Sequence, residues 1–274
     1  MPQPSELTCC LRALHLSLAA ECYEQTAEEA RREKLTHEQF LLALARRELE
    51  HREESRTQRW LHESRLPLEK SLASFDRARL PAKVVATLNT LVEGEFLQRA
   101  ENVLVFGNPG SGKTHLVCAL AQELIHRGRR ILFSSCQLLV QDLLRAKREL
   151  ALAQELKRLA RYEAVIIDDI GYVQQDRQEM EVLFALLADR YERRSVLITS
   201  NLPFSKWDSI FKDPMTTAAA VDRLVHHSTI VELNLPSYRL QSAKRGTVRG
   251  GESPTEAGSP KASRTDSSGK EVKR

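Results

Sequence analysis

The sequence lacks a long apolar segment, a cysteine framework and a marked excess of charge. No apolar run approaches the ~18 residues that a membrane span requires. No basic segment precedes the first apolar stretch, as it would in a signal peptide. The 5 cysteines form no CxxC pair, which argues against a zinc site or a set of disulfides. We therefore expect free thiols, a cytoplasmic location and no membrane partner.

The charge balance does not by itself indicate a nucleic-acid partner. The 274 residues include 41 Lys plus Arg and 37 Asp plus Glu, a net charge of +4. Basic and acidic residues are equal in number up to residue 240, so the whole excess lies in 241–274. Any DNA-binding face on the folded part must come from local segregation of charge.

The first 66 residues are expected to form a small all-helical domain. Four leucines recur at three- and four-residue steps, which is typical of the apolar stripe of one helix; they are Leu7, Leu11, Leu14 and Leu18. A later helix should begin after Thr36, because Thr36 and Gln39 have the spacing of a capping box. We expect that helix to continue to about Ser64.

Residues 67–101 are expected to be a connector that ends in one helix over 82–96, with Pro81 at its start. Short apolar strands then alternate with helices over 102–245, which favours an α/β domain with a central parallel sheet between two layers of helices. Strands are expected at 102–106, 129–135, 164–168, 195–200 and 228–233, and helices after the first three at 113–126, 136–149 and 178–193. Residues 246–274 are rich in Gly, Ser, Pro and charge, so we expect a disordered tail.

The segment GNPGSGKT between the first strand and its helix matches the phosphate-binding P-loop pattern GxxxxGK[ST] in full. Glycines allow successive backbone N–H groups to face an anion, and the helix N-terminus adds its positive dipole end. Lys113 is expected to reach the β- and γ-phosphates of ATP, and the Thr114 hydroxyl to ligate Mg²⁺. The expected nucleotide-binding residues are Gly107, Asn108, Pro109, Gly110, Ser111, Gly112, Lys113 and Thr114.

Two carboxylates follow four apolar residues at the end of the third strand. Asp168 is expected to hold Mg²⁺, and Asp169 to polarise the attacking water. Paired acids that merely end a buried strand are the alternative.

Two further polar residues stand where a γ-phosphate could be sensed. Thr199, Ser200 and Asn201 end the fourth strand, and Asn201 is the best candidate to face the phosphate and the water; the alternative is a turn residue before Pro203. Arg223 lies on a short helix before the last strand, where it could act on the nucleotide of a neighbouring subunit. A surface ion pair with Asp222 is the alternative for Arg223.

Several segments in combination resemble the IstB-type transposition helper ATPases, a branch of the AAA+ superfamily close to the DnaC helicase loaders. They are GNPGSGKTHL, RYEAVIIDDIGY, DRYERRSVLITSNLPFSKW and AAAVDRLVHHS, and the resemblance covers about residues 7–243. It implies an AAA+ fold, ATP and Mg²⁺ as ligands, double-stranded DNA and the transposase of the same mobile element as partners, and assembly into an oligomer on DNA.

The resemblance also implies roles for single residues. Asp168 matches the Walker B acid, Asn201 the sensor 1 position and Arg223 the arginine finger, while Arg239 resembles the sensor 2 position. Asp169 stands where many relatives have a catalytic Glu, which leaves open a nucleotide-gated DNA-binding scaffold with negligible hydrolysis. A replicative helicase loader with the same core is the other alternative.

Two groups of basic residues are candidates for contact with DNA phosphates. Arg52, Arg56 and Arg59 form a stripe on the long helix, although interleaved glutamates favour ordinary ion pairs. The second group consists of Arg127, Arg129, Arg130, Lys147 and Arg148.

Overall fold

The computed structural model describes residues 5–171, 176–203, 206–207 and 214–238. Arg239 and the segment 246–274, for which we predict disorder, lie outside these residues. Within the described part, no helix combines the length and the apolar character needed to cross a membrane.

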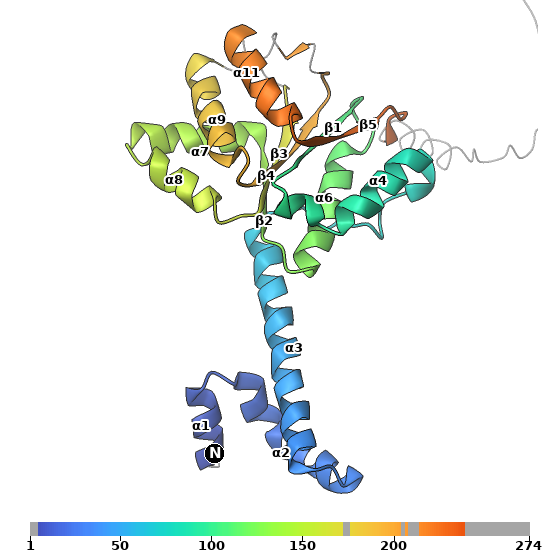
Figure 1. Ribbon diagram of the computed structural model, residues 1–274, viewed down its shortest axis with the longest axis vertical. Helices are drawn as coiled ribbons and strands as arrows, with labels where there is room; N and C mark the ends of the chain where they lie inside the picture. Colours follow the sequence, from blue (N-terminus) through green and yellow to red (C-terminus); the bar gives the residue numbers. More distant parts are fainter. Residues whose placement is uncertain (1–4, 172–175, 204–205, 208–213, 239–274) are drawn as a thin grey trace, which may run out of the picture. The chain divides into compact units, whose positions relative to one another are not determined.

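Five parallel strands form one sheet in the order β2-β3-β4-β1-β5 (Figure 1). The strands are β1 (Asn102–Gly107), β2 (Ile131–Ser135), β3 (Ala164–Ile170), β4 (Ser195–Ser200) and β5 (Ser228–Leu233), which confirms the expected strands to within two residues. β1 pairs with β4 and β5, so the strand that leads into the P-loop lies inside the sheet. All strands run the same way, and their carboxyl ends therefore meet at one edge.

Helices cover both faces of the sheet, and each face has its own apolar core. The helices are α4 (Ala82–Val92), α5 (Glu95–Gln98), α6 (Lys113–His126), α7 (Cys136–Arg148), α8 (Leu152–Leu159), α9 (Arg177–Arg190) and α11 (Pro214–Val225). Leu104 of β1 packs in the cluster that includes α7, α8 and α9, whereas its neighbours Val103 and Val105 pack in the cluster that includes α4 and α6. This alternation is the period of a strand buried on both sides, and it confirms the three-layer α/β fold.

Three helices precede this domain: α1 (Glu6–Ala13), α2 (Ser17–Glu33) and α3 (His37–Glu63). The capping box predicted at the start of α3 is present, since the amide of Gln39 donates to Thr36 Oγ1 and the amide of Thr36 donates to Gln39 Oε1. α3 ends one residue before the expected limit at Ser64. The division of the chain into four domains stays a prediction.

The prediction of one helix along the first leucine stripe was wrong. The chain breaks between α1 and α2, where His15 has a left-handed φ of 56°. The buried carboxylate of Glu48 on α3 accepts the amide N–H of Ala19 at 2.9 Å, so it caps the exposed amides at the start of α2 from outside the helix. Burial raises the pKa of Glu48, but this amide and Arg52 outweigh it and lower the pKa overall.

Two other helices also differ from expectation. The helix expected over 82–96 is divided at Gly94, whose φ of 77° ends α4 and precedes α5. After α7 the chain turns at Leu150, which has a φ of 57°, and then forms α8, an element that was not expected. Gly94 is a sequence signal for the break between α4 and α5, but no Gly or Pro marks the turn between α7 and α8.

Candidate functional site

The P-loop joins β1 to α6, and its tight curve requires glycine at two positions. A Cβ atom at Gly107 would collide with the backbone carbonyl of Leu233 on the neighbouring strand β5. Gly112 precedes α6 with a φ of 100°, which L side chains rarely adopt. The first amides of α6 therefore point toward the carboxyl edge of the sheet, as a phosphate site requires.

The polar side chains of the loop suit an anionic ligand. Lys113 is buried, and its ammonium group donates to the carbonyl oxygens of Gly107 and Asn108 at 2.9 and 3.1 Å. These two hydrogen bonds hold the Lys113 ammonium group against the P-loop backbone. The hydroxyl of Ser111 is buried and finds no hydrogen-bond partner among the described residues. A buried polar atom without a partner is costly, and a phosphate oxygen would satisfy it.

Asp168 lies at the centre of a hydrogen-bond network that connects the P-loop helix with two strands. The Thr114 hydroxyl on α6 donates to Asp168 Oδ1 at 2.9 Å, and the Thr199 hydroxyl on β4 donates to the same oxygen at 2.6 Å. Thr199 also accepts the backbone N–H of Asp169 at 2.8 Å. The two predicted metal ligands, Thr114 and Asp168, are therefore brought together.

The Asp168 carboxylate is buried, and this burial raises its pKa, against the hydrogen bonds from Thr199 and Thr114 that lower it. The neighbouring charge of Asp169 raises the pKa of Asp168 further. An ionised carboxylate is costly to bury, and a cation bound beside it offsets that cost. Carboxylate and hydroxyl oxygens are the ligands that Mg²⁺ prefers, so these residues fit the metal that accompanies ATP.

Asp169 points out of the sheet because the pairing of β3 with β4 is irregular at this point. The register shifts between Ile167 and Ile170, and Asp169 has a φ of 60°. Its side chain is exposed, whereas that of Asp168 is buried. Asp and Asn tolerate the left-handed region better than most L residues do, so a short acid suits this backbone.

Of the other predicted site residues that the structure describes, only Asn201 lies near the two acids. Asn201 is half-buried and directly follows Ser200, which pairs with Ile170 at the end of β3, so it lies at the same edge as the two acids. Arg223 lies in the last turn of α11 and is exposed. Arg239 lies outside the described residues. The roles of Asn201, Arg223 and Arg239 stay predictions.

Sequence reasoning missed the contribution of the connector and underestimated Thr199. The His115 ring contacts Phe75 edge-on with ring centroids 4.9 Å apart, and its Nε2 atom lies 3.0 Å from the carbonyl oxygen of Ser71. A Cβ at Gly112 would lie 3.4 Å from Phe75, so the connector borders the P-loop. No motif marks the connector, but the polar end of β4 was a signal for Thr199.

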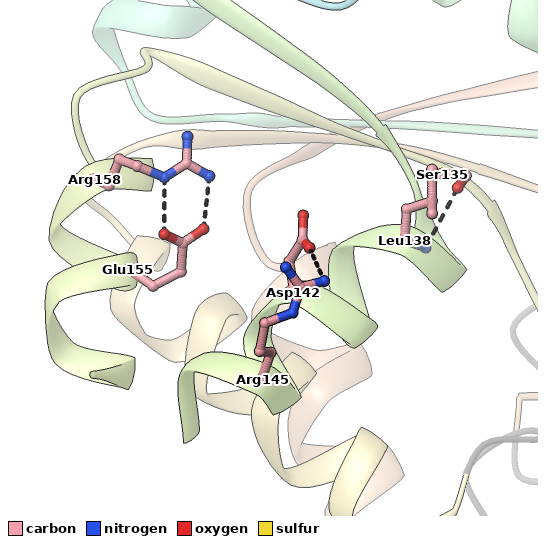
Figure 2. Close-up of polar contacts among 6 residues, drawn as sticks. All are labelled: Ser135, Leu138, Asp142, Arg145, Glu155 and Arg158. Carbon is pink, nitrogen blue, oxygen red and sulfur yellow. Dashed lines mark hydrogen bonds and ion pairs between the residues drawn. The ribbon is translucent and has the colours of Figure 1, made fainter. Parts of the chain in front are cut away.

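Most of the basic residues considered for DNA contact are paired with acids. Arg127 binds Glu93, Arg129 binds Glu163, Arg130 binds Glu63 and Lys147 binds Glu181, while Arg148 is exposed. Figure 2 shows two similar pairs: Arg145 with Asp142 on α7, and Arg158 with both oxygens of Glu155 on α8. On α3, the guanidinium of Arg52 binds Glu48 and the carbonyl oxygen of His15. Among the described residues, five of these eight basic side chains are therefore paired with acids.

The strand order, the P-loop after β1 and the acid at the end of β3 define a P-loop α/β fold of the AAA+ type. The fold is similar to that of the DnaC helicase loader, with a TM-score of 0.53 and 16% identity over 61% of this chain and 97% of that one. It is also similar to that of DnaI, with a TM-score of 0.51 and 21% identity over 63% of this chain and 94% of that one.

Sequence comparison then gives the family. The chain belongs to the IstB-like ATP-binding proteins, whose family profile matches residues 9–246. An insertion sequence ATP-binding protein of Sinorhizobium fredii is 44% identical over 85% of this chain and 78% of its own. The insertion sequence IS21 ATP-binding protein of Pseudomonas aeruginosa is 36% identical over 87% of this chain and 89% of its own. The family resemblance found in the sequence is therefore confirmed.

Proposed function

We propose that this protein is an ATP-dependent DNA-binding ATPase that assists the transposase of its own insertion sequence in choosing and joining a target. The observation that carries the ATPase part is the network of Thr114, Asp168 and Thr199 at the carboxyl edge of the sheet. The names of the relatives, which are insertion sequence ATP-binding proteins, support the role in transposition.

In the proposed reaction, a water molecule attacks the γ-phosphorus of ATP and the bond to the ADP oxygen breaks. Lys113 and the amides of the P-loop bind and orient the phosphates. Thr114 and Asp168 would hold Mg²⁺, whose charge would offset that of the phosphate oxygens. Asp169 accepts the proton of the attacking water, and Asn201 holds that water in line. The left-handed backbone and exposure of Asp169 support this role, because the carboxylate is free to face the nucleotide.

Arg223 completes the site from a neighbouring subunit in our proposal. Its exposure in the single chain is consistent with a contact that only an assembly supplies. ATP then stabilises an oligomer on DNA, and hydrolysis weakens it because the γ-phosphate contact is lost. The end of α7, with Lys147 and the exposed Arg148, is the part of the second basic group that we assign to DNA phosphates. No base-reading element is proposed, so sequence preference should depend on DNA deformability.

A strand-transfer reaction tests the transposition role directly. Purified transposase of the same element, donor ends and a supercoiled target plasmid are incubated with ATP, with or without this protein. We expect insertions that depend on this protein and on an intact P-loop, with Lys113→Ala as the inactive variant and Lys157→Ala, an exposed lysine of α8, as the matched control. Insertion at the same rate without the protein would contradict the proposal. Stimulated loading of the replicative helicase instead would favour the helicase-loader alternative.

A further inference from the structure

A cluster of two histidines and one glutamate lies at the edge of the sheet opposite the nucleotide site. Donor atoms of Glu192, His226 and His227 all lie within 4.8 Å of one another, and all three residues are exposed. Glu192 belongs to the connection between α9 and β4, and the histidines join α11 to β5. These connections lead into the amino ends of strands, whereas the P-loop and Asp168 lie at the carboxyl ends. No step of the proposed ATPase reaction uses the cluster.

The backbone holds both parts of the cluster in place. The amide of His226 donates to the carbonyl oxygen of Asp222 at 2.9 Å, which continues the last turn of α11. The carbonyl oxygen of His227 accepts the amide of Asn102 at 2.7 Å, which ties it to the start of β1. The two imidazole rings lie 4.2 Å apart between centroids, so consecutive residues present both rings to one side. α9 and α11 pack against each other (Figure 1), which brings Glu192 to the histidines.

Tyr191 supplies an outer contact to two of the three side chains. Its hydroxyl oxygen lies 3.5 Å from Nδ1 of His226. The Tyr191 side chain also forms a hydrogen bond with Glu192. If Nδ1–H of His226 donates to Tyr191 and Tyr191 donates to Glu192, then Nε2 of His226 is left as a lone-pair donor. Metal-binding histidines characteristically have such an outer partner on the second ring nitrogen.

We propose that Glu192, His226 and His227 bind one divalent transition-metal ion of the Zn²⁺ class. Two imidazoles and one carboxylate suit Zn²⁺, Co²⁺ or Ni²⁺ and leave further positions for water. Mg²⁺ prefers oxygen ligands, so the nucleotide site and this cluster select different ions. The ion would connect the α9–β4 segment to the end of α11 through ligands 34 and 35 residues apart in sequence.

A bound ion would also affect the orientation of Arg223, and this step rests on the proposed function. Arg223 lies three residues before His226, in the last turn of α11. An ion on His226 restrains the last turn of α11 against the α9–β4 segment. The restraint would fix the direction in which Arg223 leaves the subunit, and so change hydrolysis that depends on it.

Metal titration of the full chain tests the site without reference to activity. Any affinity tag that contains histidine is removed, and Mg²⁺ is present in excess to fill oxygen sites. Co²⁺ is followed by its visible absorption and Zn²⁺ by calorimetry. We expect one equivalent of either ion to bind, with affinity lowered more than about tenfold by His226→Ala, by His227→Ala and, less strongly, by Tyr191→Phe. His51→Ala and His62→Ala, exposed histidines of α3, are the matched controls and should bind like the wild type.

The outcomes distinguish metal binding by the cluster from the effect of the metal on hydrolysis that depends on Arg223. Absence of stoichiometric binding by the wild type, or unchanged binding by both cluster variants, overturns the site. Zn²⁺ should also raise the melting temperature of the wild type but not that of His227→Ala. The melting transition of each variant without Zn²⁺ shows whether that variant is folded. If Zn²⁺ binds yet changes DNA-stimulated hydrolysis equally in the wild type and His227→Ala, the link to Arg223 is overturned. Absence of hydrolysis by the wild type in Mg²⁺, both with and without Zn²⁺, would instead contradict the proposed function and not the metal site.

Discussion

The hydroxyl of Thr114 donates to the carboxylate of Asp168 at 2.9 Å, although the two residues are separated by more than fifty positions in the chain. This contact joins the first turn of the P-loop helix to the end of the third strand. Thr199 approaches the same carboxylate oxygen from the fourth strand, at 2.6 Å. The phosphate-binding loop, the predicted metal ligands and the strand that precedes Asn201 therefore form one connected unit.

Lys113→Ala should weaken ATP binding by about tenfold to a hundredfold, because a charged donor to the phosphates is removed. Fluorescent nucleotide titration measures the effect. Lys157→Ala is the control, since Lys157 is an exposed lysine of α8. Equal nucleotide affinity in the Lys113 variant and the wild type, with the melting temperature retained, would refute the P-loop assignment.

Asp169→Asn should bind ATP normally and hydrolyse it about a hundredfold to ten-thousandfold more slowly, because the amide cannot accept a proton from water. Single-turnover hydrolysis beside a binding titration separates the two effects. Hydrolysis at the wild-type rate would remove Asp169 from the reaction. Negligible hydrolysis in the wild type itself would favour the scaffold alternative.

Arg223→Ala should spare nucleotide binding and reduce assembly-stimulated hydrolysis by about a thousandfold or more. Arg193→Ala, an exposed arginine that lies before β4, is the control. Mixing provides a stricter check. Subunits with Arg223→Ala supply an intact Asp169, and subunits with Asp169→Asn supply an intact Arg223, so a mixture should recover activity that neither variant has. If no activity returns although the variants co-assemble, Arg223 does not act in trans.

Asp168→Asn should lose Mg²⁺-dependent nucleotide binding while its free energy of unfolding at pH 7 is equal to or greater than that of the wild type. Burial raises the pKa of Asp168, so the ionised carboxylate opposes folding above that raised pKa. The opposition declines as pH falls through the raised pKa and is gone near the ordinary value of about 4. The difference between variant and wild type should therefore shrink from pH 7 to about 4 in urea titrations without nucleotide. A variant that is markedly less stable at pH 7 would contradict this reasoning.

The sequence predicted well those features that depend on local pattern. The P-loop after β1, the acids at the end of β3 and the capping box of Thr36 each need only a few neighbouring residues, and each is present. The alternation of short apolar strands with helices similarly predicted a parallel sheet covered on both faces, and each face has its own apolar core.

What the sequence missed depends on contacts between distant segments. Glu48 and Arg52 have the spacing of an ordinary helical pair, and the pair exists, but Glu48 is also buried as the cap of another helix. Arg127 and Arg130 appeared available for DNA, yet each binds a glutamate from a segment more than thirty residues away. Thr199 could be placed at the end of a strand, but its bond to Asp168 required the register of β3 and β4. Tertiary contact decided each of these cases.

We propose that ATP and DNA together control assembly and hydrolysis through one site. The most direct test measures ATP hydrolysis with and without duplex DNA while particle size is followed in the same samples. The proposed function predicts larger particles with ATP and DNA, faster hydrolysis in those samples, and neither effect in Lys113→Ala. Particles of one size under all conditions, with hydrolysis unaffected by DNA, would contradict it.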